Sequence, residues 1–330
     1  MNFYRMPAIG GSDTQKTVYI YEDSAVVNKE GPHLQVRVHD ELVFTEPLAN
    51  IECLIIFNLV QITTQCLRSL LSQGSDILYT TKYCKIFGCT YARISQRPAL
   101  RMAQYAISAQ PDERLLIAKK LIAAKLAGQR KTVSAFRNMG ASAAARILKD
   151  AENYVNDAAD SMELLGYEGA AAAQYFKALS QCLSNMIFTR RDYHPAHDPF
   201  NALLNLTYML TLHKIDSILI GKGFDTSLGF LHTNSDDRMA LSLDILEPFR
   251  GLLDRFVVKM VNLGEIKDND FENISQGCVL SKKGFKRYIA RYSDEIEITP
   301  ATEVMAERLK DYVMMREGSM FEIQDLSRVL

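Results

Sequence analysis

The sequence predicts an α+β protein in which a small β-rich domain is followed by a larger all-α domain. Between residues 17 and 92, short stretches rich in β-branched and aromatic residues are separated by turn-forming pairs. From Pro98 onward, the apolar residues recur with helical spacing through most of the remaining chain. We therefore expect a β-rich domain in residues 1–97 and an α-helical domain in residues 98–330.

The β-rich part contains short strand candidates and one helix. The apolar run at residues 51–57, IECLIIF, is typical of a strand that is covered on both faces. A helix is predicted over residues 63–73 and is expected to end at Gly74. Exposed strand edges in so small a domain could pair with a second copy of the chain. The predicted strands are residues 17–21, 25–28, 34–38, 41–45, 51–57, 76–79 and 85–92.

Prolines, glycines and acidic residues mark the expected helix ends in the second part. Pro98 and Pro111 suit the first turns of helices that follow them. Gly128 and Gly140 are expected to mark bends or breaks. A further helix is predicted from Asp198-Pro199 through Ile220, with glycines closing it. The last three predicted helices are residues 252–261, 283–291 and 301–316.

The overall composition is that of an ordinary globular protein. Of 330 residues, 48% are hydrophobic and 23% are charged. The six cysteines include no CxxC pair, which favours reduced thiols over disulfides or a zinc site. No apolar run approaches membrane-spanning length, and the N-terminus lacks a signal-peptide core. We therefore expect a soluble protein of the cytoplasm with no membrane partner.

Basic residues are concentrated in two parts of a chain whose formal net charge is only −1. The segment from residue 114 to residue 149 has no Asp or Glu, and several acids follow it directly. Such runs are often solvated helix faces, but an acid-free run of this length favours contacts with nucleic-acid phosphates. Its cations are Arg114, Lys119, Lys120, Lys125, Arg130, Lys131, Arg137, Arg146 and Lys149. A second cluster, interleaved with aromatic residues, is Lys282, Lys283, Lys286, Arg287 and Arg291.

One short stretch contains the residue types of a divalent metal site. His232 opens it, and Asp244 and Glu247 follow, three residues apart, so that the two acids share a face if this part is helical. Carboxylates together with one imidazole are suitable ligands for a divalent cation. The alternative is that Arg238 and Arg250 neutralise two structural acids on a well-buried helix.

Glu168, in Gly166-Tyr167-Glu168-Gly169, is a further candidate that precedes an alanine-rich helix. The flanking glycines would let a ligand approach the carboxylate closely. The alternative is an ordinary glutamate at a helix start, stabilised by the helix dipole. Pro248 follows Glu247 directly, so we expect the helix with the two acids to end or kink there.

These motifs, in their order along the chain, resemble the CRISPR-associated integrase family Cas-one. The resemblance extends from about residue 17 to 292 and departs from the family pattern at residues 205–208, at Thr226 and at Gly128. The motifs that carry it are residues 55–67, Lys125 with Gln129-Arg130, Glu168 with its glycines and Tyr175, Asp198-Pro199, Asn201, Leu203-Leu204, Tyr208, Gly223, residues 229–232, Arg238, Leu241, Asp244, Glu247, Phe249-Arg250 and Asp254-Arg255.

The resemblance implies a metal-dependent DNA endonuclease and integrase of CRISPR adaptation. Such an enzyme joins the 3′-hydroxyl of spacer DNA to the CRISPR repeat by phosphodiester transesterification. Carried over by motif, the catalytic residues and metal ligands are Glu168, His232 and Glu247, with Asp244 close enough to assist. The expected cofactor is Mg²⁺ or Mn²⁺, since carboxylates suit either ion and an imidazole favours Mn²⁺.

The resemblance also implies a β-rich dimerisation domain and a helical domain that binds metal and DNA, in a prokaryotic cytoplasm. The expected partners are double-stranded and branched DNA, a second copy of the chain, and a small Cas-two protein that bridges two dimers. The alternative is a non-catalytic DNA-binding scaffold whose acidic residues and histidine are structural, and the basic clusters argue against a small-molecule metalloenzyme. The residues assigned to DNA are Lys119, Lys125, Arg130, Arg190, Arg238, Arg250, Lys283, Lys286 and Arg287.

Overall fold

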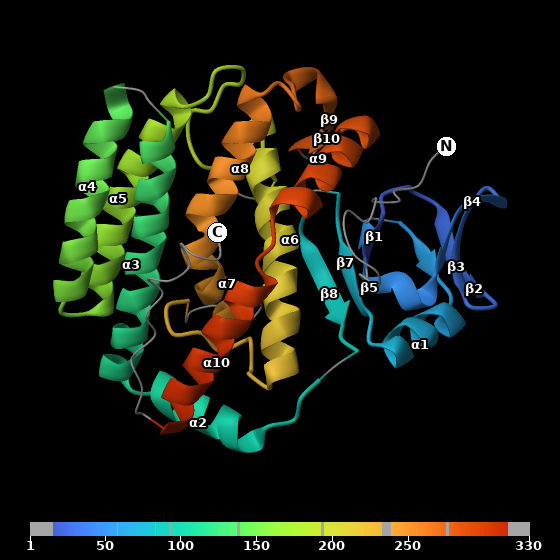
Figure 1. Cartoon of the computed structure of the whole chain (residues 1–330), viewed down its shortest axis with the longest axis horizontal. Coiled ribbons are helices and arrows are strands. Elements are labelled where there is room, and N and C mark those ends of the chain that lie inside the picture. The colour runs from blue at the N-terminus through green and yellow to red at the C-terminus, as the bar shows by residue number, and fades with distance from the viewer. Residues whose placement is uncertain are drawn as a thin grey trace.

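The structure, a computed structural model, describes residues 16–57, 59–82, 84–92, 94–136, 139–192, 195–232, 239–274 and 277–315. A strand-rich N-terminal part stands beside a helical part that contains most of the chain (Figure 1). The expected α+β class is therefore confirmed. The division of the chain at residues 97 and 98 remains a prediction, and one hydrophobic core includes residues from both parts.

Two four-stranded sheets form the N-terminal part. The first has the order β1-β5-β7-β8, in which β1, β5 and β7 are parallel and the edge strand β8 is antiparallel to β7. The second has the order β4-β3-β2-β6. Helix α1 (Thr64–Gln73) ends as predicted at Gly74, whose left-handed conformation closes it. The strands are β1 (Lys16–Ile20), β2 (Ala25–Glu30), β3 (His33–Val38), β4 (Glu41–Pro47), β5 (Ile51–Phe57), β6 (Gln61–Ile62), β7 (Asp76–Thr80) and β8 (Ile86–Thr90).

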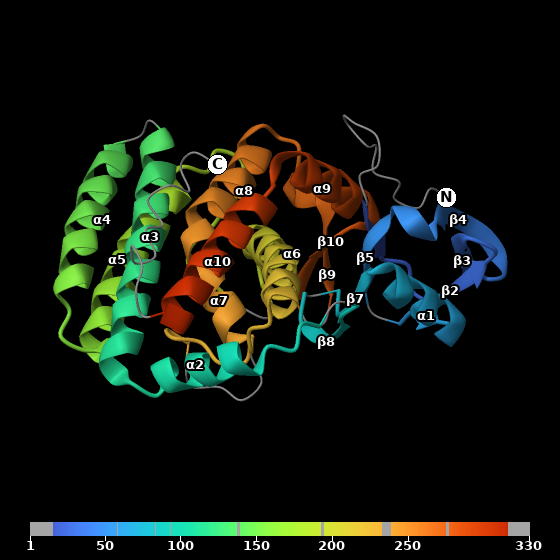
Figure 2. The same cartoon turned by 60° about the horizontal axis from the view of Figure 1, so that its bottom comes forward.

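Strand β5 is covered on both faces, as its apolar sequence predicts. Leu54 and Ile56 belong to the core between the two sheets. Ile55 and Phe57, which point to the opposite face, belong to the core shared with the helices. Helix α6 (Pro199–Lys222) lies between the first sheet and the remaining long helices in both views (Figures 1 and 2). The sheet is therefore packed directly against the helical part.

The helical part has three long helices, α3, α4 and α5, side by side at the end farthest from the sheets (Figures 1 and 2). Pro98, Pro111 and Pro199 occupy first turns, as predicted. The remaining elements are α2 (Pro98–Ser108), α3 (Pro111–Ala135), α4 (Met139–Asp157), α5 (Ser161–Gln181), α7 (Ala240–Leu246), the short 3-10 helix η2 (Glu247–Phe249), α8 (Arg250–Asn262), α9 (Lys282–Glu295) and α10 (Thr299–Met315).

Two local expectations in the helical part are wrong, and one element was not predicted. Glu168 lies two turns inside α5 rather than before a helix, because the Asp160 side chain caps the helix by accepting the Met162 and Glu163 backbone N–H groups. Helix α3 continues through Gly128 without a break. An antiparallel pair that the sequence did not predict, β9 (Phe271–Ile274) and β10 (Gly277–Leu280), lies within the helical part.

Gly128 lies where the backbone of α3 meets the backbone of α8 in a close helix crossing, and the glycine that this crossing requires is Gly251. A Cβ atom on Gly251, in α8, would lie 2.6 Å from the backbone nitrogen of Gln129 and closer still to Gly128. Thr132 fixes the crossing by donating a hydrogen bond of 2.6 Å from its hydroxyl to the Gly251 carbonyl. The crossing holds η2 and its first residue, Glu247, against α3.

All six cysteines are free, as the lack of paired motifs predicts. Burial raises the pKa of Cys66 and of Cys278 to about 11, so both remain thiols at neutral pH. Within the described ranges, no helix combines the length and the apolar character that crossing a bilayer requires.

Candidate metal centre

Two acidic residues that are far apart in the sequence meet at one buried lysine. Lys125, in the middle of α3, places its Nζ atom 2.7 Å from Oε2 of Glu247 and in contact with Oε1 of Glu168. The Glu247 side chain is 2% exposed and the Lys125 side chain 10%. The structure therefore brings Glu168 on α5 together with Glu247 on η2, as the motif comparison predicts, and adds a cation that the sequence analysis assigned to DNA.

Glu247 is held in its ionised form by cations on both sides. Arg250 donates a hydrogen bond of 2.8 Å from Nε to Oε1 of Glu247, while Lys125 lies at the other oxygen. Burial raises the pKa of Glu247, but the positive charges of Arg250, Lys125 and His232 lower it by more. The net result is a pKa of about 2. The expected pairing of Arg250 with a buried acid is therefore confirmed for Glu247.

Pro248 determines the local shape that presents Glu247. Helix α7 ends at Leu246, and Glu247 begins the 3-10 helix η2, with Pro248 in its first turn. A proline has no backbone N–H, so α7 cannot continue through this position with regular hydrogen bonds. The predicted end of the helix beside the acids is therefore confirmed.

Asp244 acts on His232 and its loop. Its carboxylate is fully buried and accepts backbone hydrogen bonds from Phe230, Leu231 and His232 at 2.5, 3.0 and 3.0 Å. Its Oδ1 atom also lies 2.7 Å from Nδ1 of the His232 ring. Since Nδ1 is engaged, Nε2 is the ring nitrogen that remains for a ligand.

The His232 ring is one-third exposed, with 34% of its side chain accessible to solvent. Burial lowers its pKa, whereas the hydrogen bond and negative charge of Asp244 raise it, and the net effect is a raised pKa. A Cβ atom on Gly229 would lie 2.7 Å from Oδ2 of Asp244, so only glycine lets the chain turn this closely around the carboxylate.

The three predicted ligands fit a divalent cation in their chemistry. Two carboxylates and one imidazole are oxygen and nitrogen donors suited to Mg²⁺ or Mn²⁺. Arg250 binds Oε1 of Glu247, so the other oxygen, Oε2, has the Lys125 ammonium at 2.7 Å as its cationic neighbour. In the described part of the chain, however, no three His, Cys, Asp or Glu side chains are spaced to hold a metal. The carboxylate pair is arranged around an ammonium group instead.

The basic residues assigned to DNA lie in different surroundings. Lys119 and Arg130 make local contacts, to the Asn156 carbonyl at 3.0 Å and to Glu152 at 2.6 Å. Arg287 pairs with Asp270. Arg190, Lys283 and Lys286 are exposed, Lys125 and Arg250 bind the acids described above, and Arg238 is outside the described residues. The assignment of these residues to DNA therefore remains a prediction.

A buried polar network behind Glu247 was not predicted from the residues alone. Asp254 on α8 is fully buried and accepts hydrogen bonds from the hydroxyl groups of Tyr175, at 2.6 Å, and Tyr208. Burial raises the pKa of Asp254 to about 6, although both tyrosines and Arg250 oppose this rise. The Arg250 guanidinium lies 4.6 Å from the centre of the Tyr208 ring, so the network supports the arginine that holds Glu247.

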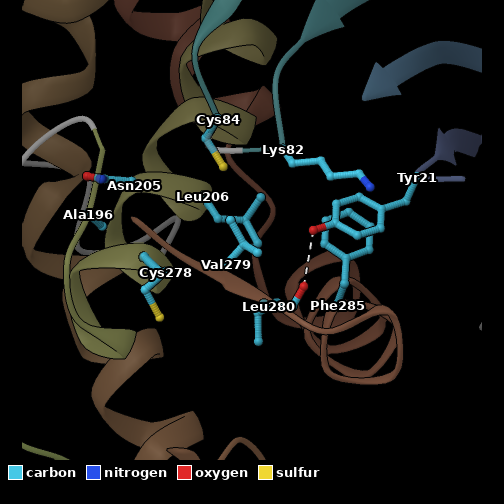
Figure 3. A pocket seen from close by; sticks show the side chains of 11 residues that line it. Tyr21, Lys82, Cys84, Ala196, Asn205, Leu206, Cys278, Val279, Leu280 and Phe285 are labelled. Carbon is cyan, nitrogen blue, oxygen red and sulfur yellow. Dashed lines mark hydrogen bonds between the residues drawn. The ribbon is translucent and has the colours of Figure 1, made fainter. Parts of the chain in front are cut away.

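A small pocket lies elsewhere, where the first sheet meets α6, β10 and α9 (Figure 3). Tyr21 and Phe285 stack at one end of it with their ring centres 4.3 Å apart, and the Tyr21 hydroxyl donates to the Leu280 carbonyl at 3.1 Å. Cys84 and Cys278 also line it. The lining residues do not include Glu168, His232, Asp244 or Glu247, so the pocket is separate from the candidate metal centre.

The fold recurs in several solved structures. A CAS1 protein from Thermotoga maritima aligns with a TM-score of 0.80 at 20% identity, over 93% of this chain and 99% of that chain. A casposase bound to an integration product also aligns with a TM-score of 0.80 at 20% identity, over 94% of each chain. A Cas6-RT-Cas1–Cas2 complex aligns with the same score at 22% identity, over 98% of this chain and 37% of that chain.

The model of the family described as CRISPR associated protein Cas1 matches residues 18–294. The chain therefore belongs to this family, the Cas-one family of the sequence analysis. It is 31% identical, over 293 residues, to a Cas4 exonuclease/Cas1 endonuclease fusion from Rhodospirillum rubrum, covering 85% of this chain but only half of the fusion. It is 29% identical, over 88% of each chain, to a CRISPR-associated endonuclease Cas1 from Thermus thermophilus.

The charge on Glu247 predicts a specific pH dependence of stability in the metal-free protein. Its folded-state pKa of about 2 lies below its ordinary value of 4.5, so its contribution is present above pH 4.5 and is lost as the pH falls toward 2. We expect this loss to reach about 3 kcal/mol. In thermal melts with EDTA, Glu247→Gln should flatten the decline between about pH 5 and pH 3. Parallel pH profiles of the two proteins would contradict this account.

Proposed function

We propose that this chain is a metal-dependent DNA endonuclease and integrase of CRISPR adaptation, which joins the 3′-hydroxyl of spacer DNA to the CRISPR repeat. One observation carries the proposal: two carboxylates from distant elements meet at a single buried cation. A histidine oriented by a buried acid lies nearby and is electrostatically coupled to Glu247. The names of the curated relatives, which include endonucleases of this family, support the same activity.

Glu168, Glu247 and Nε2 of His232 would hold the divalent cation. A bound cation supplies charge neutralisation at a phosphate and activates an attacking oxygen. In strand joining, the 3′-hydroxyl oxygen of the spacer would attack a phosphorus of the repeat, the P–O bond to the repeat's own 3′ oxygen would break, and that oxygen would leave as a 3′-hydroxyl after taking up a proton. In hydrolysis, the attacking oxygen would be that of water. Asp244 keeps the His232 ring oriented with Nε2 outward, and Arg250 fixes one oxygen of Glu247. Either Mg²⁺ or Mn²⁺ suits these donors, with the imidazole favouring Mn²⁺.

We also propose the partners that the family resemblance implies. Double-stranded and branched DNA would contact the basic residues of α3 and α9 and the exposed Arg190. A second copy would contact the β-rich domain. A structure with the Cas1 fold has been solved in complex with Cas2, which supports a Cas-two protein that bridges two dimers of this chain.

The activity is tested by incubating the purified protein with DNA and separating the products on a denaturing gel. The substrates are a labelled duplex with a free 3′-hydroxyl, a branched duplex and a supercoiled plasmid containing CRISPR repeats. We expect new phosphodiester products in Mn²⁺ or Mg²⁺ and none in EDTA. DNA binding that falls steeply with salt but yields no product with either metal would instead support the non-catalytic scaffold.

Asp244→Asn is expected to weaken metal binding although Asp244 is not itself a ligand in this account. The amide is uncharged and presents one acceptor oxygen in place of two, so it cannot hold both the 230–232 backbone and the ring Nδ1. We expect Mn²⁺ affinity and strand joining to fall by about 10–100-fold. The ¹⁵N signals of the His232 ring should show a changed tautomer balance. An unchanged ring and unchanged affinity would rule out the positioning role.

A further inference from the structure

The Lys125 ammonium group occupies the space between the two acids that are proposed to bind metal. The Lys125 residue as a whole is 8% exposed. Its Nζ atom contacts Oε2 of Glu247, at 2.7 Å, and Oε1 of Glu168. The two carboxylates are supplied by different elements, α5 and η2, which meet here across α3. A single positive charge therefore bridges a pair of negative charges at the core of the site.

The two cations that contact Glu247 differ in how firmly they are held. Arg250 binds Oε1 through its planar guanidinium, which is also packed over the Tyr208 ring at 4.6 Å. Lys125 has a compact charge on a flexible four-carbon chain. Its Nζ atom lies 2.7 Å from Oε2, the oxygen of Glu247 that Arg250 does not bind. Oε2 is therefore the oxygen of Glu247 that a metal can take over, while Arg250 keeps Oε1 fixed.

From this arrangement we propose that Lys125 is the resident counter-cation of the carboxylate pair, and that a divalent metal ion binds by displacing its ammonium group. This inference rests on the proposed function. A metal ion held by Glu168 and Glu247 would compete with the Lys125 ammonium group for the carboxylate oxygens, because the two cations would repel each other and use the same lone pairs. Lys125 thus keeps the metal-free site assembled and reduces its affinity for metal.

The alternative role, a direct contact between Lys125 and DNA phosphate, fits the structure less well. The Lys125 side chain is 10% exposed, and two carboxylates already surround its charge. Exposed lysines such as Lys131 and Lys283 are far better placed for a phosphate backbone. The burial and the two partners favour a role inside the site.

The test compares Mn²⁺ binding by wild type and Lys125→Met, measured by calorimetric titration and by the rise in melting temperature on adding Mn²⁺. Methionine retains most of the side-chain volume and removes the charge. We expect the variant to bind Mn²⁺ about tenfold more tightly or better, because a nearby unit charge typically shifts such equilibria by this amount. Its metal-free form should melt at a lower temperature, and Mn²⁺ should raise that temperature more than in wild type. Lys149→Met, which removes an exposed partner of Glu152, is the control and should bind Mn²⁺ like wild type.

Equal or weaker Mn²⁺ binding by Lys125→Met would overturn the inference, since Lys125 would then support the metal-bound site. If Lys125→Met does not fold without metal, Lys125→Gln provides the same comparison, and recovery of the folded state on adding Mn²⁺ would support displacement. The proposed function fails in a different way. In that case Mn²⁺ binding that depends on Glu247 would be absent from wild type and from both lysine variants.

Discussion

Replacing Glu247 with glutamine is expected to reduce metal-dependent strand joining by about a hundredfold or more. The amide preserves the size of the side chain but removes the negative charge that a metal ion requires. Glu247 is 2% exposed and lies between Arg250 and Lys125, so solvent does not offset the loss of its negative charge. The same loss is expected for Glu168→Gln and for His232→Ala. The measurement is the initial rate of joining in Mn²⁺ on a branched duplex.

Glu163→Gln on α5 is a suitable control for these three variants. Glu163 is an exposed acid on the same helix as Glu168, and it contacts the Ala159 backbone and the Tyr167 hydroxyl. We expect its joining rate to match wild type, and size-exclusion chromatography should show the same elution volume for every variant as for wild type. Full Mn²⁺-dependent activity in His232→Ala would contradict the assignment of the ligands.

The second large effect is expected in stability, from Gly251→Ala. The added Cβ atom would lie 2.6 Å from the Gln129 nitrogen and closer to the Gly128 backbone, where no flexible side chain can move aside. Overpacking of this kind costs about 1–3 kcal/mol or more. We expect the melting temperature to fall by roughly 5 °C or more. Because the same crossing holds η2 against α3, metal affinity should fall as well.

Gly128→Ala is the matched control for this crossing. Its Cβ atom would lie 3.3 Å from the Pro248 carbonyl oxygen, which needs an adjustment of only a few tenths of an ångström. Replacing a glycine inside a helix with alanine also favours the helix by about 1 kcal/mol. We expect a melting temperature close to that of wild type. If both variants lose the same stability, the clash at Gly251 is not the cause.

Local signals in the sequence predicted most of the fold. The prolines at 98, 111 and 199 begin helices, and the glycine at 74 ends one, because a missing N–H group or a left-handed backbone acts within one turn. The apolar run in β5 predicted a covered strand because burial on both faces favours apolar residues at nearly every position, with the exposed Glu52 as the exception.

Long-range contacts explain what the sequence did not predict. Gly128 resembles a helix breaker, but its role depends on Gly251, more than a hundred residues later. Lys125 is one of nine cations in a basic segment, and nothing in its neighbours distinguishes the one that faces two acids. The network around Asp254 likewise joins three helices through tyrosine hydroxyls, which leave no periodic pattern in the sequence.

The residues of the candidate site remain a prediction, and the sequence alone did not indicate how they are arranged. The family resemblance selected Glu168, His232 and Glu247, and the structure brings the two glutamates to one ammonium group. It assigns Asp244 a contact with the His232 ring, which agrees with its expected place beside the ligands. The spacing of acids along a helix could not reveal the ammonium between them, because its position depends on how α3, α5 and η2 pack.

The central claim, a single metal site formed by Glu168, His232 and Glu247, is tested most directly by anomalous X-ray scattering from crystals grown with Mn²⁺. We predict one strong anomalous peak at about 2 Å from an oxygen of each glutamate and from Nε2 of His232. The Lys125 ammonium should have moved away from between the carboxylates. A structure at saturating Mn²⁺ with no peak at these residues, and with Lys125 still bridging Glu168 and Glu247, would contradict the account.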